Sequence, residues 1–169
     1  DRGPGGGVID YATRVQRILV PTNPVRSTIG QPIVFQTILF KDSKGILLNG
    51  LNPLLLNNDK SALGNSFDPE GIALAANGNM YIADEYGPSL YEFDRRGRLV
   101  RRFAVPANLK PVEASGAANH VDGRPTVTSG RQDNRGFEGL TTNASGTKLY
   151  AVMQDPLVNE GSSNDGRRS

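Results

Sequence analysis

The 169-residue chain contains no cysteine, a single histidine and little net charge. Without cysteine, disulfides and thiolate metal sites are excluded. The lone His120 gives little support for nucleophilic catalysis with a histidine base, and the Arg-His-Gly pattern of histidine acid phosphatases is absent. No Gly-x-Ser-x-Gly elbow occurs, which argues against a serine α/β-hydrolase. The formal net charge of +2 gives no strong indication of nucleic-acid binding.

Long apolar runs are also missing from the sequence. No stretch approaches the roughly 20 residues that a membrane-spanning helix needs, so no membrane span is expected. The longest apolar run, 32–40, is interrupted and β-branched, and it predicts a strand. Twenty glycines and eleven prolines divide the rest into short apolar segments, few of which keep a helical period. The chain is therefore predicted to be all-β, with room for a short helix within 51–63.

The middle of the chain predicts a four-stranded antiparallel meander. Its turns are Asn77-Gly78, Gly87-Pro88 and Arg95-Arg96-Gly97, all of which suit tight turns or positive φ angles. Four short strands so closely spaced are typical of one blade of a β-propeller. The expected strands are 71–76, 80–84, 89–94 and 99–105.

A sequence repeat supports the same architecture. Glu70-Gly71-Ile72 matches Glu138-Gly139-Leu140, and each copy continues through a glycine turn to a strand that contains Tyr81 or Tyr150. The two copies stay in register apart from one inserted residue before Tyr150. A repeat that twice places a carboxylate at the same point suggests a radial β-architecture with its acids near the axis.

A third, partial copy is found at residues 1–21, which resemble the later half of the first meander. We therefore expect a partial propeller, roughly two to three blades of a larger six-bladed one, with a second polypeptide chain supplying the rest because unpaired sheet edges need partners. All of 1–169 then belongs to a single propeller domain. Its predicted parts are the end of a truncated blade over 1–21, a blade over 66–106, a long loop over 107–135, the start of the next blade over 136–158 and a flexible tail over 159–169.

Several acids are candidates for a metal site at the propeller axis. Carboxylates gathered there repel one another unless a cation neutralises them, and hard oxygen ligands favour Ca²⁺. Arg135, three residues before Glu138, could hold a phosphate oxygen through its planar fork of donors. Against this, a glutamate before glycine also accepts backbone N–H bonds or pairs with an arginine, and Asp-Pro is a common turn. The acidic set is Glu70, Asp84, Glu85, Glu138, Asp155 and Glu160; the expected calcium ligands are Glu70, Glu85, Glu138 and Asp155, and the expected catalytic residues are Glu70, Glu138 and Arg135.

Arginines are concentrated between positions 95 and 102. We expect them to lie on a solvated outer hairpin, with binding of phosphate or an anionic surface as the alternative.

Four linked motifs resemble the phytase-like, "esterase-like" β-propeller family. They are Ser66-Phe67-Asp68-Pro69-Glu70-Gly71-Ile72, Tyr81-Ile82-Ala83-Asp84-Glu85-Tyr86-Gly87-Pro88, Asn134-Arg135-Gly136-Phe137-Glu138-Gly139-Leu140 and Met153-Gln154-Asp155-Pro156-Leu157. The resemblance implies an exported bacterial protein, secreted or periplasmic, with Ca²⁺-dependent hydrolysis of a phosphorylated small molecule. It places the family's characteristic acids at Glu70, Glu85 and Glu138. Two alternatives are a non-enzymatic binding or assembly propeller and a lactonase-like, sugar-directed propeller enzyme.

Overall fold

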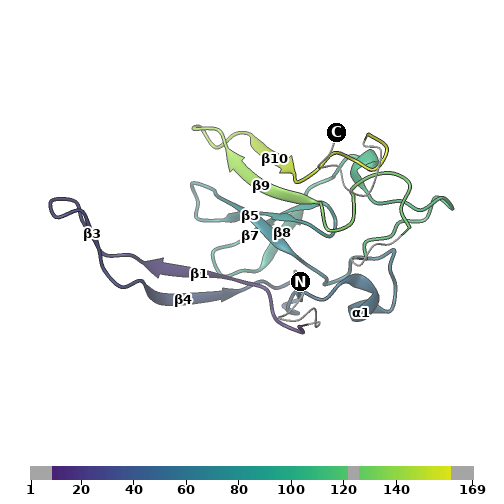
Figure 1. The fold of residues 1–169 in the computed structure, drawn as a ribbon. Helices are drawn as coiled ribbons and strands as arrows, with labels where there is room; N and C mark the ends of the chain where they lie inside the picture. Colours follow the sequence, from purple (N-terminus) through teal and green to yellow (C-terminus); the bar gives the residue numbers. More distant parts are fainter. Residues whose placement is uncertain (1–8, 122–125, 161–169) are drawn as a thin grey trace.

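The computed structural model describes residues 9–121 and 126–160, which form small antiparallel sheets with almost no helix (Figure 1). The all-β prediction is confirmed. The described residues form no closed ring of sheets, so the propeller stays a prediction. None of the helices in these ranges is long and apolar enough to cross a membrane. The elements are β1 (Arg14–Leu19), β2 (Thr22–Asn23), β3 (Thr28–Ile29), β4 (Ile33–Leu39), α1 (Pro53–Asn57), β5 (Pro69–Leu74), β6 (Met80–Asp84), β7 (Ser89–Phe93), β8 (Leu99–Arg102), the 3-10 helix η2 (Ala107–Leu109), β9 (Phe137–Thr142) and β10 (Leu149–Met153).

The predicted meander is confirmed as a four-stranded antiparallel sheet in the order β5-β6-β7-β8. Of its three turns, the first and the last contain Gly78 and Gly97 with φ angles of 85° and 81°, which only glycine adopts without strain, and the middle one contains Gly87-Pro88. Along β5, buried Gly71 and Ala73 alternate with exposed Glu70, Ile72 and Leu74, so one face of the strand is turned inward.

A cluster of aromatic rings forms the core on one face of this sheet. The ring of Phe67 meets those of Phe40 and Tyr91 edge-on, with centroid separations of 5.6 and 5.0 Å. Phe40 and Phe93 lie closer still, at 4.5 Å. The cluster also includes Ile38, Leu48, Met80 and Ile82. It joins the end of β4 and the following loop to the four-stranded sheet.

The β9–β10 hairpin lies beside β5 and β6 (Figure 1). Glycine allows this close approach, because a Cβ added to Gly71 would lie 2.8 Å from the backbone nitrogen of Leu140. The strands that begin the two copies of the sequence repeat therefore lie next to each other. Tyr150 and Val152, on one face of β10, are 51% and 62% exposed.

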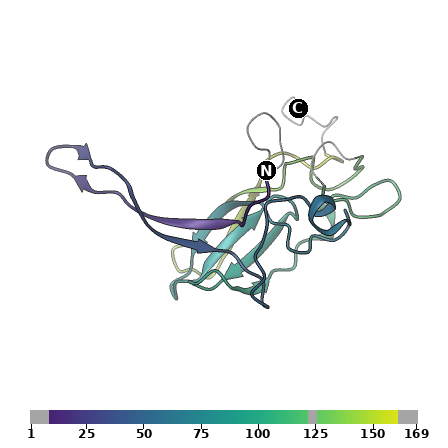
Figure 2. The same ribbon diagram turned by 90° about the horizontal axis from the view of Figure 1, so that it is seen from below.

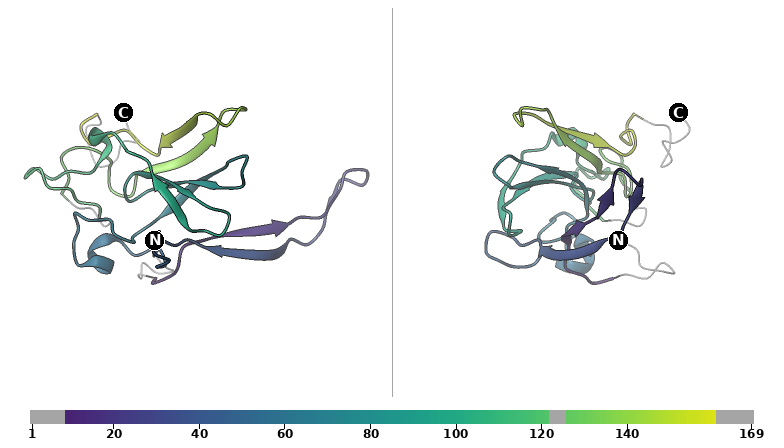
Figure 3. Two further views of the ribbon diagram at one scale, coloured as in Figure 1. Left: turned by 180° about the vertical axis from the view of Figure 1, so that it is seen from behind. Right: turned by 90° about the vertical axis from the view of Figure 1, so that its left-hand side faces the viewer.

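An arm made of β1 and β4 projects from the body, with the β2–β3 hairpin at its tip (Figures 1, 2 and 3). The strand predicted from the apolar run is confirmed as β4. Many apolar side chains of the arm are exposed, among them Val25, Ile29 and Phe35. At the base of the arm, Lys41 forms a parallel bridge with Arg98, which joins the arm to the β8 edge of the sheet.

Other predicted regions have mixed outcomes. The short helix allowed within 51–63 is present as α1, where the Asn52 side chain caps the first turn by accepting a hydrogen bond from the Leu55 N–H. The predicted loop over 107–135 contains η2 and isolated bridges made by Val112. Residues 1–8 of the predicted truncated blade and 161–169 of the predicted tail lie outside the described residues. Within 9–21, β1 pairs with β4.

Candidate metal site

Three carboxylates come together where β5 begins and β6 ends. Asp68 directly precedes β5, Glu70 is the second residue of β5, and Glu85 directly follows β6. The backbone N–H of Glu85 donates to the Asp68 carbonyl oxygen at 2.9 Å, so the antiparallel pairing of the two strands sets these residues side by side. One oxygen from each of the three side chains lies within 4.8 Å of the other two. Asp68 and Glu85 are buried, and Glu70 is at the solvent-exposed edge of the group.

Asp84 has a different task from the three acids of the cluster. Its fully buried carboxylate accepts hydrogen bonds from the N–H of Asp68 at 2.9 Å and the N–H of Gly87 at 3.0 Å. It therefore fixes both the entry to β5 and the turn after β6. Burial and the nearby Asp68 charge raise the pKa of Asp84 to about 7, although the backbone donors oppose the rise. Asp84 is accordingly a positioning residue for Asp68 and Glu85.

The cluster is electrostatically unfavourable without a cation. Loss of surrounding water raises the pKa of Glu70 to about 7, and the charges of Asp68 and Glu138 add to the rise. Although Glu70 is partly accessible to solvent, the surrounding protein and like charges still disfavour its ionised form. Burial also raises the pKa of Asp68, although a side-chain hydrogen bond with Glu85 partly lowers it. A hydrogen bond between two carboxyl groups requires a shared proton, which a bound cation would replace.

Glu138 reaches the same site from β9. Its negative charge helps to raise the pKa values of both Asp68 and Glu70, so the acid of the second repeat copy lies near that of the first. Gly136 makes this approach possible, because its Cα packs directly against the backbone of Glu85. A Cβ at this position would overlap the Glu85 carbonyl oxygen.

We expect Gly136→Ala to destabilise the chain by at least about 2 kcal/mol, because the overlap is with backbone that cannot rotate away. Gly139→Ala, three residues later in β9, is the matched control: its Cβ would lie 3.7 Å from Val152, an ordinary contact, and should change stability by less than about 0.5 kcal/mol. Urea-induced unfolding of both variants measures the difference. Equal stability of the two would contradict the assigned contact.

Arg135 and Asp155 lie together rather than in the three-carboxylate cluster. The Arg135 Nε is 2.7 Å from an Asp155 oxygen, and Arg135 Nη1 donates to the Gln154 side chain at 3.3 Å. This pair matches the alternative in which an acid engages an arginine. The assignment of Asp155 as a metal ligand and of Arg135 as a catalytic residue stays a prediction. The Glu160 carboxylate accepts a hydrogen bond from the Leu157 N–H, and this bond caps the turn that follows Asp155.

Two functional candidates escaped the sequence analysis. Asp68 belongs to the cluster, and the signal that could have found it is Asp68-Pro69-Glu70, since residues two apart at a strand entry lie on the same side. Arg131 is fully buried and donates from Nε to the Tyr86 carbonyl oxygen and from Nη2 to the His120 carbonyl oxygen, both at 3.0 Å. Its charge acts favourably on Asp68. No sequence pattern distinguished Arg131 from the other arginines.

The donor set fits a hard divalent cation. All the converging atoms are carboxylate oxygens, the ligands that Ca²⁺ prefers. Asp68, Glu70 and Glu85 could hold the ion, whereas Glu138 acts on the group through its charge.

The sequence profile of a known protein family matches residues 19–169, and its description is "Phytase-like: Esterase-like activity of phytase". The chain belongs to this phytase-like family. The resemblance inferred from the four motifs is therefore confirmed, and all members of the acidic cluster lie within the matched range.

One relative of this phytase-like chain is an "Uncharacterized secreted protein" from Arthroderma benhamiae, 33% identical over 108 residues. The alignment covers 57% of the present chain and 21% of the relative, so the chain corresponds to a minor part of that protein. No solved structure matches the chain.

Proposed function

We propose that this phytase-like chain is part of a β-propeller that binds Ca²⁺ and hydrolyses a phosphoester. The observation that carries the proposal is the convergence of Asp68, Glu70 and Glu85, with Glu138 approaching from the second repeat copy. The acids at the ends of β5 and β6 and on β9 repel one another when ionised, and a bound cation would relieve that repulsion.

The residues of the chain then have separate roles. Asp68, Glu70 and Glu85 hold the ion through oxygen ligands, and Asp84 fixes the backbone that carries two of them. When bound, Ca²⁺ supplies Lewis-acid polarisation of a phosphoryl oxygen and a template for substrate and water. Glu138, whose charge acts on Glu70, would accept a proton from the attacking water. Arg135 keeps the remaining donors of its guanidinium for a phosphate oxygen, while Asp155 orients its Nε side.

The arrangement of strands supports the propeller. The β5–β8 meander has the four antiparallel strands of a blade, and β9 and β10 correspond to the first two strands of the next. Strands β5 and β9 lie side by side, as the first strands of neighbouring blades do around an axis. Tyr150 and Val152 on β10 present an apolar face that further strands would cover. We propose that these strands and the remaining metal ligands come from the rest of the propeller, supplied by a second polypeptide.

The relative from Arthroderma benhamiae is described as secreted, which supports an extracellular or periplasmic location for this protein. Extracellular calcium would be available to the site there.

Phosphate release from phytate and from a model phosphomonoester should require calcium and stop when a chelator is added. The assay uses the chain assembled with the remaining blades, and Glu138→Gln should lower the rate by about 10²–10⁴-fold if Glu138 is the base. Glu113→Gln, which alters an acid paired with Lys60 outside the cluster, should keep full activity.

Three outcomes separate the alternatives. Absence of phosphate release at saturating calcium would rule out the phosphoesterase. Calcium binding without turnover of any ester would favour a binding module. Turnover of sugar lactones in place of phosphoesters would favour a lactonase-like, sugar-directed enzyme.

A further inference from the structure

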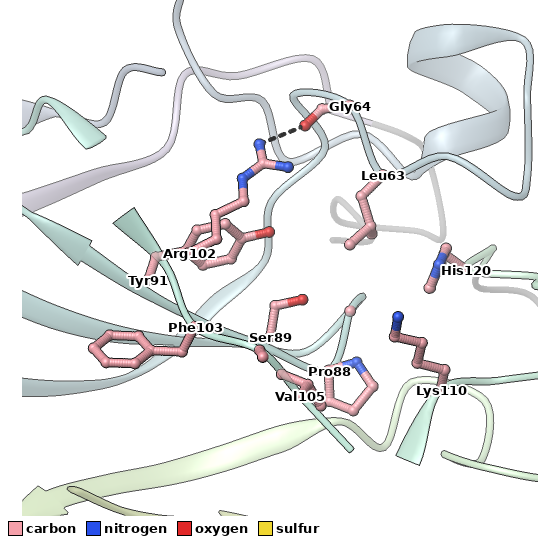
Figure 4. Close-up of a pocket in the computed structure, with 12 residues that line it drawn as sticks. Leu63, Gly64, Pro88, Ser89, Tyr91, Arg102, Phe103, Val105, Lys110 and His120 are labelled. Carbon is pink, nitrogen blue, oxygen red and sulfur yellow. Dashed lines mark hydrogen bonds between the residues drawn. The ribbon is translucent and has the colours of Figure 1, made fainter. Parts of the chain in front are cut away.

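A pocket of about 380 Å³ lies beside the turn after β6 (Figure 4). None of the three carboxylates of the acidic cluster lines it. Gly87 and Pro88 form one wall, two residues beyond Glu85, and Leu63 and Gly64 form another. The rest comes from the segment 102–105, from β7 and from the start and end of the segment 110–120.

The twelve lining residues include no aspartate or glutamate, and they include Arg102 and Lys110. Arg102 is held in place, since its Nη2 donates to the Gly64 carbonyl oxygen at 3.1 Å and its guanidinium lies 5.2 Å from the centre of the Tyr91 ring. Lys110 points its ammonium group into the pocket (Figure 4). Among the residues that the structure describes, it finds no hydrogen-bond acceptor or ion-pair partner.

The acids nearest these two cations have other partners. The Asp84 carboxylate, behind the Gly87 wall, accepts hydrogen bonds from the backbone N–H groups of Asp68 and Gly87. Glu92 is paired with Arg101 at 2.7 Å, and the carboxylate of Glu113 is paired with Lys60. His120 adds no charge near neutral pH, because burial and the Arg131 charge lower its pKa to about 4. The positive field of the pocket therefore comes from Arg102 and Lys110.

The remaining lining groups are suited to an organic ligand. The Ser89 hydroxyl points into the pocket and can donate or accept a hydrogen bond (Figure 4). Leu63, Pro88 and Val105 add apolar surface, and the Leu63 side chain points into the pocket (Figure 4). Ligand pockets of this size commonly combine an apolar wall with a few polar groups that fix orientation.

We infer that this pocket binds a small molecule that carries a phosphate or other oxyanion group next to an apolar or ring-shaped body. Arg102 and Lys110 hold the oxyanion, and Leu63, Pro88 and Val105 contact the body. The inference does not depend on the proposed hydrolase, because the two sites have opposite charge and share no lining residue. The arginine cluster, expected to be a solvated hairpin, thus contributes one member to an anion site.

Calorimetric titration in the presence of a chelator tests this inference apart from any calcium chemistry. The probes are phenyl phosphate, inorganic phosphate and benzoate. Phenyl phosphate should bind more tightly than inorganic phosphate, because its ring contacts the apolar wall. Saturable binding of benzoate as well would extend the ligand class to carboxylates, and its absence would restrict the class to phosphate.

The matched variants are Lys110→Gln and Lys44→Gln, which make the same charge change inside the pocket and in the exposed 42–46 turn. Lys110→Gln should weaken phenyl phosphate binding about tenfold or more, the usual loss for a hydrogen bond to a charged group, and Lys44→Gln should leave it unchanged. Val105→Glu, which adds a carboxylate to the lining, should abolish binding. Circular dichroism confirms that each variant is folded.

Two results would overturn the inference. One is the absence of saturable binding for all three probes at millimolar concentration. The other is an equal loss in Lys110→Gln and Lys44→Gln, which would mean that only the overall charge of the chain attracts the anion.

Discussion

Glu70→Gln is expected to abolish the stabilisation of the chain by calcium while making the chain more stable in chelator. The variant loses one carboxylate ligand, so calcium at 100 times the wild-type dissociation constant should no longer add the roughly 2.7 kcal/mol that such binding supplies. In chelator, removing one of the mutually repelling charges should add about 1 kcal/mol near pH 8, a modest figure because Glu70 is partly solvated. Thermal unfolding with and without calcium measures both effects.

The same variant should change the pH dependence of stability. The folded-state pKa of Glu70 is raised from its usual 4.5 to about 7, so the folded chain keeps a proton that the unfolded chain releases. Stability in chelator therefore falls as pH rises from about 4.5 to 7. Asp84 and His120 also titrate in or near this range but are present in both proteins. The difference between wild type and variant thus reports on Glu70 together with its interaction with Asp68.

Glu113→Gln is the control for these measurements. It removes an acid that pairs with Lys60 outside the cluster, so it should retain the full calcium response. If Glu70→Gln responded to calcium as the wild type does, the carboxylate cluster would not be the metal site.

Phe67→Ala is expected to cost about 3–5 kcal/mol of unfolding free energy, a large share of the stability of a small domain. Phe67 is fully buried, and its ring contacts those of Phe40, Tyr91 and Phe93. Truncation leaves a cavity in the cluster that joins the end of β4 to the four-stranded sheet. Equilibrium unfolding in urea measures the loss.

Phe35→Ala is the matched control, since its ring is 62% exposed on the arm. Its effect should remain within about 0.5 kcal/mol. A comparable loss from both substitutions would mean that the arm packs against the body or another copy, and that the aromatic cluster is not the main core.

The sequence was most informative where local patterns decide structure. Asn77-Gly78 and Arg96-Gly97 specify tight turns, and the segments on either side of them are short and rich in apolar residues, so β5 to β8 could be predicted closely. The arm could not be predicted in this way. The pairing of β1 with β4 joins segments about 20 residues apart, and nothing in either strand specifies its partner.

The candidate site was partly predictable for a related reason. Glu70 and Glu138 mark the repeat, and the Glu138 charge contributes to the raised pKa of Glu70. Asp68 and Arg131 escaped notice because their roles arise from tertiary contacts: Asp68 from its position opposite Glu85, and Arg131 from the carbonyl groups that it reaches. The Arg135–Asp155 pair depends equally on the approach of β10 to the start of β9, which sequence spacing does not specify.

The buried guanidinium of Arg131 helps to hold the long segment that follows β8 in place. Among its described residues, the Arg131 guanidinium ties the segment to the Tyr86 carbonyl group and to its own His120, in addition to the His120 N–H bond to the Lys60 carbonyl and the Glu113–Lys60 ion pair. A lysine could not make both contacts with the same geometry, so even a charge-preserving replacement would release this attachment. The segment should then open as one unit and become a preferred target for proteases, while the β5–β8 sheet remains intact. Limited proteolysis in the absence of any ligand would thus show whether the segment is still attached to the turn that carries Glu85.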